Sequence, residues 1–197
     1  MTTGLDDFKY ILDEFRGLSV WALGGAAVPF AAVLVELSPP WPTGIVFITA
    51  IIELVAIVIS FQWFKGIKRS IVSGVLLFSL ISFSGLGFAY LVNLSKYAYE
   101  VPTSKERFVK GNECTKDALL VFSDLCPDLG INELRQAEYD AERLWTQDSL
   151  ANIRVRLVSL WVGTFLSLSI LLGTFLVYQT AQKGRIRKPE SITGSGD

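Results

Sequence analysis

The apolar run at residues 44–64 constrains the fold of this chain more than any other feature. Within it stands a single carboxylate, Glu53, near the middle. An α-helix of this length extends roughly 31 Å, about the hydrocarbon thickness of a bilayer. The run is too long and too uniformly apolar for a strand of a soluble core. It predicts a transmembrane helix with an ionisable group at the depth where charge is most costly.

Along the rest of the chain, apolar runs alternate with connections that carry most of the charged residues. The 197 residues are 51% hydrophobic and 19% charged, with a mean hydropathy of +0.43. That is too apolar for an ordinary soluble domain unless the charges are kept apart from the apolar runs. The pattern predicts an all-α membrane protein with four transmembrane helices, at residues 18–37, 44–64, 70–94 and 155–179.

Several classes of function are disfavoured by composition and motifs. The formal net charge of −1 and the lack of a basic stripe argue against direct nucleic-acid binding. The chain has no His, which is the commonest general base and metal ligand. It also lacks a nucleotide-binding loop and a Ser/His/Asp set. We therefore expect no enzymatic activity, no catalytic or metal site and no cofactor.

The two terminal segments are expected to lie on the membrane surface and in the cytoplasm. Residues 1–17 predict an amphipathic helix, which either shields the end of the first span, lies in the membrane interface or contacts a neighbouring subunit. Residues 180–197 predict a disordered cytoplasmic tail. The apolar positions of the first segment are Leu5, Phe8, Leu12 and Phe15.

Basic residues predict the orientation in the membrane. The link after the first span has no Lys or Arg, whereas the other short connections are basic, so the positive-inside rule places both termini in the cytoplasm. Beyond setting topology, the same residues are candidate contacts for anionic lipids or an acidic cytoplasmic partner. They are Lys65, Lys68, Arg69, Lys183, Arg185, Arg187 and Lys188.

Residues 95–154 then form an extracytoplasmic, mainly helical cap between the third and fourth spans. Thr115 is suited to cap a helix at 116–123, residues 127–130 predict a turn, and a second helix is expected at 131–144. Residues 146–149 predict the start of a final helix that continues into the fourth span.

Cys114 and Cys126 lie in this cap segment. In an oxidising compartment they would close a short loop, and such a disulfide contributes roughly 2–4 kcal/mol. Thiol oxidases with four spans use a Cys-x-x-Cys pair, which this chain lacks. We expect a structural disulfide rather than a redox site.

Glu53 is the candidate gating residue. No Lys or Arg lies at the predicted depth of another span to pair with it. Three alternatives remain: a neutral Glu that packs against Ser or Thr of a neighbouring span, a water-lined cavity, or a ring formed between subunits. The first is structural, and the other two would serve an ion path or gate.

Small residues in the fourth span predict close helix packing, within one protomer or between two. Near the start of this span, Arg154 and Arg156 are expected to reach lipid phosphate or to pair with Asp140 or Glu142 of the cap. The seam consists of Ser159, Gly163 and Ser167, with Gly173 and Ser169 as a second pair.

The cap carries a further pattern. It reads GNEC at 111–114, CPDL at 126–129, AEYD at 137–140 and LWT at 144–146, with Ser149 before Arg154. Together with four spans and one long outer connection, it resembles the KwaA membrane subunits of the bacterial Kiwa anti-phage defence system. The resemblance covers most of the chain. It implies a homo-oligomer, with a tetramer favoured, in the bacterial inner membrane, and a cytoplasmic effector protein as partner.

The leading functional hypothesis is a non-enzymatic sensor and scaffold. Its cap would detect an envelope disturbance, and its bundle would recruit or activate the effector. The alternative is a pore-forming effector that depolarises the cell, suggested by Glu53 and the small-residue helices. A transporter or thiol relay ranks last, because the chain is short and shows no inverted repeat.

Overall fold

The computed structural model describes residues 24–25, 27–34, 36–64, 66–100 and 107–186, with side chains described as far as Gln179. The elements in chain order are α2 (Val28–Leu34), α3 (Ile45–Phe64), α4 (Arg69–Tyr97), β1 (Ala98–Glu100), β2 (Arg107–Val109), α5 (Lys116–Val121), α6 (Ile131–Gln136), α7 (Ala141–Leu144) and α8 (Gln147–Ile186).

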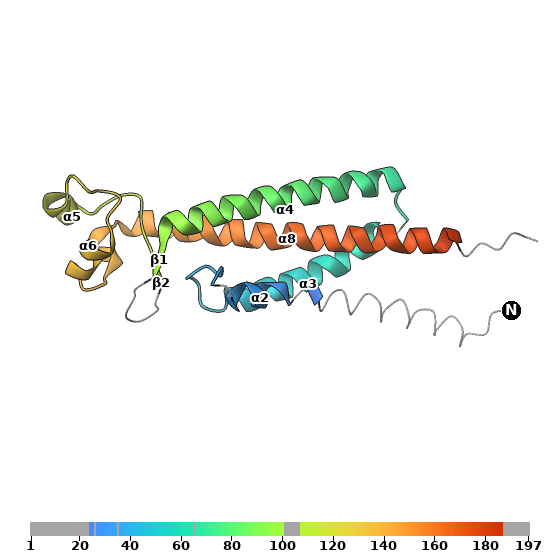
Figure 1. The fold of residues 1–197 in the computed structure, drawn as a ribbon, viewed down its shortest axis with the longest axis horizontal. Coiled ribbons are helices and arrows are strands. Elements are labelled where there is room, and N and C mark those ends of the chain that lie inside the picture. The colour runs from blue at the N-terminus through green and yellow to red at the C-terminus, as the bar shows by residue number, and fades with distance from the viewer. Residues whose placement is uncertain (1–23, 26, 35, 65, 101–106, 187–197) are drawn as a thin grey trace, which may run out of the picture.

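Helix α8 is the axis of the molecule. Its 40 residues contain no Pro, and at 1.5 Å per residue they span roughly 60 Å. The side chain of Thr146 caps its start, since Oγ1 accepts a hydrogen bond from the Ser149 amide at 3.3 Å. Helices α3 and α4 each pack along α8, and α2 packs against α3. Figure 1 shows this arrangement, with the small elements gathered beyond one end of α4.

Three of the described helices are long and apolar enough to cross a membrane: α3, α4 and the part of α8 from Gln147 to Gln179. They coincide with the predicted spans at 44–64, 70–94 and 155–179, and they indicate a membrane protein. The first predicted span, 18–37, lies partly outside the described residues, and α2 covers its end. The number of four spans therefore stays a prediction. The predicted amphipathic helix at 1–17 lies outside the described residues. The prediction of a disordered tail from residue 180 is wrong for residues 180–186, because they belong to α8, and residues 187–197 lie outside the described part.

The buried face of α3 contains polar residues among apolar ones. Its buried positions recur every three or four residues, as one face of a helix requires. Lipid chains are as apolar as Leu, so packing shape and hydrogen bonds select the inward face of a membrane helix. The buried residues of α3 are Ile45, Thr49, Ala50, Glu53, Ile57, Ser60 and Phe61.

The small residues of α8 do not form one seam. A Cβ on Gly173 would lie 2.6 Å from the Ser60 Cβ and 3.1 Å from the Ile57 carbonyl, so this Gly lets α3 approach closely. Gly163 instead faces α4, where its Cβ would lie 3.4 Å from Leu86. Both packing contacts are therefore made within the protomer. Two other residues of the predicted seam lie elsewhere. Ser159 is exposed, and Ser167 lines a groove of about 500 Å³ between α3 and α4.

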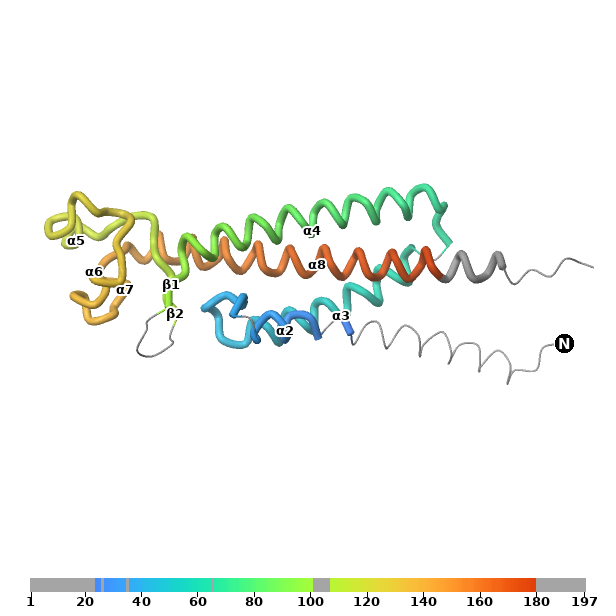
Figure 2. The backbone as a smooth tube through the Cα atoms, in the orientation of Figure 1, coloured from blue at the N-terminus to red at the C-terminus, as the bar shows by residue number. Residues whose placement is uncertain are grey.

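The cap, defined here as residues 98–100 and 107–146, is shorter than predicted and not entirely helical. Helix α4 continues to Tyr97 and α8 begins at Gln147, so both enter the segment predicted as cap at 95–154. Strands β1 and β2 form an antiparallel pair in which Glu100 lies opposite Arg107. Figure 2 shows this pair at the end of α4, with α5, α6 and α7 beyond it.

The predicted helix at 131–144 is wrong, because the chain turns after α6. Glu138 and Tyr139 have left-handed φ values of 58° and 62°. The Tyr139 amide bonds the Leu134 carbonyl at 2.9 Å and the Glu138 amide bonds that of Arg135 at 3.1 Å. These are the paired bonds that end a helix in a Schellman motif. Asp140 then caps α7 by accepting from the Glu142 amide at 3.0 Å.

Candidate functional site

A hydroxyl group in the first turn of α8 binds two backbone amides of the cap. Ser149, in the first turn of α8, accepts hydrogen bonds at Oγ from the amides of Asn112 at 2.6 Å and Glu113 at 3.0 Å. The same hydroxyl donates to Asn112 Oδ1 at 2.8 Å. A hydroxyl has one proton and two lone pairs, so all its hydrogen-bonding capacity is used here. Ser149 is buried, and the first turn of α8 is held against the start of the cap.

Backbone bonds extend this joint on either side. The Thr146 amide donates to the Glu113 carbonyl at 3.0 Å, and Cys114 pairs with Trp145 in an antiparallel bridge. A Cβ on Gly111 would lie 2.6 Å from the Trp145 Cβ and 2.5 Å from the Ser149 Oγ. Only glycine allows the backbone to approach this closely. We call residues 111–114 and 145–149 the joint.

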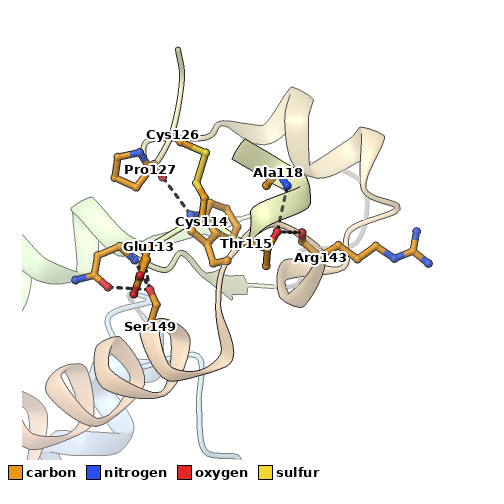
Figure 3. The surroundings of a disulfide bond; sticks show 10 residues. Glu113, Cys114, Thr115, Ala118, Cys126, Pro127, Arg143 and Ser149 are labelled. Carbon is orange, nitrogen blue, oxygen red and sulfur yellow. Dashed lines mark hydrogen bonds between the residues drawn. A yellow bond between two sulfur atoms is a disulfide. The ribbon is translucent and has the colours of Figure 1, made fainter. Parts of the chain in front are cut away.

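The disulfide lies beside the joint, as Figure 3 shows. Cys114 and Cys126 are bonded, with their Cα atoms 6.2 Å apart, which confirms the predicted pairing. Trp145 is fully buried, and its indole N–H donates to the Pro127 carbonyl at 3.1 Å. The residue that follows the disulfide loop is thus fastened to Trp145, which leads into α8.

Thr115 caps α5 as predicted, by accepting from the Ala118 amide at 3.2 Å. Its hydroxyl also donates to the Arg143 carbonyl at 2.7 Å, which links α5 to the end of α7. Helix α5 itself ends at Val121, earlier than the expected 123. The core of the cap, to which Leu150 of α8 also contributes, consists of Cys114, Ala118, Leu129, Leu134, Ala137, Ala141, Leu144 and Trp145.

The cap also presents apolar side chains outward. We call these residues, on and just after α5, the apolar tip. Leu120 is 85% exposed, and the other members are 47–70% exposed. A surface of this kind favours contact with another molecule. The apolar tip consists of Leu119, Leu120, Val121 and Leu125.

The cap end of the bundle is tied to the link between α2 and α3. Arg107 of β2 donates from Nη1 to the Ser38 carbonyl at 3.1 Å, and the Tyr90 hydroxyl of α4 donates to the Leu37 carbonyl at 2.6 Å. The Arg154 guanidinium of α8 lies 5.9 Å from the centroid of the Trp41 ring. A cation over an indole at this distance is attracted to the ring face.

In the described part of the chain, neither Arg154 nor Arg156 forms the predicted pairing with the cap carboxylates. Asp140 pairs with Arg143 at 3.4 Å, and Glu142 accepts from Gln147 at 3.2 Å. Each carboxylate therefore has a partner close by in sequence.

Glu53 lies on the inward face of α3, and its side chain is fully buried against the rest of the bundle. Neither of its carboxyl oxygens has a hydrogen-bond partner among the described residues. The nearby hydroxyl of Ser169 is directed to the Phe165 carbonyl, at 2.9 Å. A ring of Glu53 side chains between subunits is contradicted, because such a ring requires the side chain on the surface of the protomer.

Thr49 of α3 makes a hydrogen bond to α8 that was not predicted from the sequence. The Trp161 indole N–H of α8 donates to the Thr49 Oγ1 at 2.9 Å, and Thr49 donates to the Ile45 carbonyl at 2.8 Å. The sequence feature that could have predicted this contact is Trp161, because a buried indole N–H needs a hydrogen-bond acceptor. Thr49 lies one turn from Glu53 and on the same face of α3.

At the opposite end of the bundle, Arg69 interacts within the chain. Its Nη2 donates to the Tyr178 hydroxyl at 2.6 Å, and its guanidinium lies 4.5 Å from the centroid of that ring. Lys68 is exposed. The other predicted contacts of this end, Lys65, Lys183, Arg185, Arg187 and Lys188, have side chains outside the described part of the chain.

Within the described part of the chain, no three His, Cys, Asp or Glu side chains are grouped as metal ligands. Comparison with protein-family models, curated proteins and solved structures finds no match for this chain.

Proposed function

We propose that this protein is a membrane sensor and scaffold subunit of a bacterial antiviral defence system. Its cap senses a disturbance of the envelope, and its bundle passes the signal to a cytoplasmic effector protein. The antiviral setting and the tetrameric assembly come from the sequence resemblance described above. The transmission of a signal along the chain is argued from the geometry.

The joint is the observation that carries the proposal. Ser149 holds two backbone amides of the cap, and α8 continues without a break from Gln147 to Ile186. A helix of about 60 Å is a rigid element over this length. Movement of the cap therefore moves the far end of α8 as well, and the apolar tip gives the cap a surface through which to receive the disturbance.

The proposal is tested by loosening the joint without altering the bundle. Ser149→Ala leaves the amides of Asn112 and Glu113 without their acceptor, and Gly111→Ala forces the backbone at residue 111 away from Trp145. Ser159→Ala is the matched control, because it makes the same change at an exposed position of α8. Phage plating on cells that express this protein together with its proposed effector measures protection, and co-purification measures effector binding.

We expect both joint variants to lose protection while the effector remains bound, and Ser159→Ala to behave as wild type. Amide hydrogen exchange in the cap checks that the joint has been loosened, and a non-reducing gel checks that the disulfide is intact. Full protection by a joint variant whose cap amides exchange faster would contradict the proposal.

Ion conduction is the second candidate, and one observation favours it. A carboxyl without a partner inside a membrane bundle is costly, and such groups mark ion and proton paths. Because Glu53 faces inward, conduction requires α3 to move relative to α8. Flux from proteoliposomes under a voltage step, with wild type against Glu53→Gln, tests this function. Equal flux from the two proteins would exclude Glu53 from the path.

A further inference from the structure

A cavity of about 630 Å³ opens at the cap end of the bundle. Its walls come from three parts of the chain: the end of α2, the last turns of α4 and the β1–β2 pair. The charged residues that line the cavity are Glu36, Glu100 and Arg107, and its apolar side includes Leu37 and Leu91. It lies at the level of the link that contains Trp41, where lipid headgroups meet the helices of a membrane protein.

The three charged side chains converge from separate elements. Glu100 and Arg107 lie opposite each other on β1 and β2, and Glu36 follows α2. Arg107 gives one N–H to the Ser38 carbonyl, and a guanidinium has five. No ion pair joins any two of these three groups in the described part of the chain. Among the described residues, therefore, no ion pair competes with a ligand that carries both signs of charge.

Glu36 occupies a position that favours glycine. Its φ is 57°, in the left-handed region. The Leu37 amide bonds the Ala32 carbonyl at 2.9 Å, and the Glu36 amide bonds that of Val33 at 3.0 Å. This is the Schellman ending of α2, where the left-handed residue is usually Gly. A carboxylate is kept here against the backbone preference, and strain of this kind gathers at ligand sites.

An apolar groove of about 440 Å³ adjoins the cavity. Leu37 and Leu91 line both. The groove runs between α2 and α4 over α8, and its walls include Val28, Phe83 and Phe165. A charged cavity thus leads directly into an apolar groove inside the membrane span. A phospholipid has the same two parts in the same order.

We propose that this site binds one phospholipid with a primary-amine headgroup. Arg107 binds the phosphate, the carboxylates of Glu36 and Glu100 bind the ammonium group, and an acyl chain lies in the groove. Two carboxylates against one guanidinium disfavour an anionic headgroup. Choline is disfavoured because its quaternary ammonium has no N–H to donate. The inference requires only that the chain lies in a membrane and is independent of the sensing role.

Burial raises the pKa of Tyr99, which also lines the cavity. Its hydroxyl therefore stays protonated and has no hydrogen-bond partner among the described residues. The Tyr99 side chain stacks on Phe108, on the opposite face of the strand pair from Glu100 and Arg107, and packs against the core of the cap. Tyr99 therefore takes no part in the proposed recognition of the headgroup.

Native mass spectrometry of the full chain in detergent tests the proposal. The protein is delipidated and titrated with phosphatidylethanolamine, phosphatidylcholine or phosphatidylglycerol. We expect the ethanolamine lipid to bind about tenfold more tightly than the others, since each charge-assisted hydrogen bond is worth at least that factor. Glu36→Gln with Glu100→Gln should remove this preference, and Arg107→Gln should weaken binding of all three lipids.

A second pair of variants tests the groove. Leu91→Trp fills the wall that the cavity and groove share, and should abolish retention of every lipid. Leu80→Trp is its control: it lies three turns away on a similar face of α4, and the two leucines are 46% and 44% exposed. Asp128→Asn, at an exposed position of the cap outside the joint, controls for loss of a carboxylate. Thermal unfolding checks that each variant folds.

Equal binding of the three lipids by wild type would overturn the proposal, as would unchanged preference in the double glutamine variant. Soluble glycerophosphoethanolamine distinguishes the source of the headgroup. If it binds as tightly as the lipid, and Leu91→Trp loses neither, the site recognises a free headgroup and the lipid assignment is wrong.

Discussion

At the scale of single residues, Glu53 and Thr49 differ in how the bundle satisfies them. Both are buried on the face of α3 that packs inward. Thr49 accepts from Trp161 and donates to Ile45, whereas the Glu53 oxygens have no partner in the described part of the chain. A buried polar group without a partner keeps its full desolvation cost. The two residues should therefore respond oppositely to apolar substitution.

Glu53→Met should raise the free energy of unfolding by about 1–3 kcal/mol, because it removes a buried acceptor pair that nothing satisfies. Thr49→Val should lower it by roughly 0.6–1.7 kcal/mol, the range of hydrogen bonds between membrane helices. Thermal unfolding in detergent measures both, at roughly 2–4 °C in Tm per kcal/mol. A lower Tm for Glu53→Met would show that the carboxyl has a stabilising partner. If Glu53→Met is more stable but loses function, Glu53 has a functional role that costs stability.

At the scale of helices, glycine decides how closely α3 and α8 pack. A Cβ on Gly173 meets Ser60 and a backbone carbonyl of α3, whereas one on Gly74 of α4 meets nothing within 4 Å. Backbone atoms cannot turn aside as a flexible side chain can. The same substitution should therefore have opposite effects at these two positions.

Gly173→Ala should destabilise the protein by about 1–3 kcal/mol, since the helices must separate to admit the methyl group. Gly74→Ala should stabilise it by up to about 1 kcal/mol through helix propensity alone. Thermal unfolding of the two variants, side by side in one detergent, makes the comparison. A stabilised Gly173→Ala variant would mean that α3 does not lie against α8 at this level.

At the scale of the whole molecule, most of the cap has a hydrophobic core of its own, whereas Val109 of β2 belongs to a core of the bundle. The disulfide lies entirely within the cap. The bundle cores instead gather side chains of the long helices, such as Trp161 and Phe165 in one and Ile57 in the other. Loss of the disulfide should therefore act on the cap first.

Cys114→Ser with Cys126→Ser should reduce the stability of the cap by about 2–4 kcal/mol, because the unfolded loop regains its freedom. Amide hydrogen exchange should accelerate in α5 and α6 and stay unchanged in α3 and the membrane part of α8. Equal acceleration in α3 would show that the cap and bundle unfold as one unit.

The sequence by itself determined the helical spans at α3, α4 and α8, the capping of α5 by Thr115 and the cysteine pair. Each depends on local pattern: apolar length, a capping side chain, or two cysteines in one short segment. The helix predicted at 131–144 is wrong for two reasons. Nothing in the local sequence marks Glu138 as a residue with a left-handed backbone, and Asp140 was not recognised as a second capping residue. The β1–β2 pair was missed for a similar reason, since strands of three residues are too short to show a period.

Only the tertiary structure decided which way each membrane helix faces. Residues 44–64 are apolar on every side, so hydrophobicity could not distinguish the face of α3 that meets α8 from the face that meets lipid. The choice was made by shape at Gly173 and by the Trp161–Thr49 hydrogen bond, both of which join residues more than one hundred positions apart. For the same reason Glu53 was recognised from sequence as a costly residue, and only the packed bundle placed it inside the protomer rather than between copies.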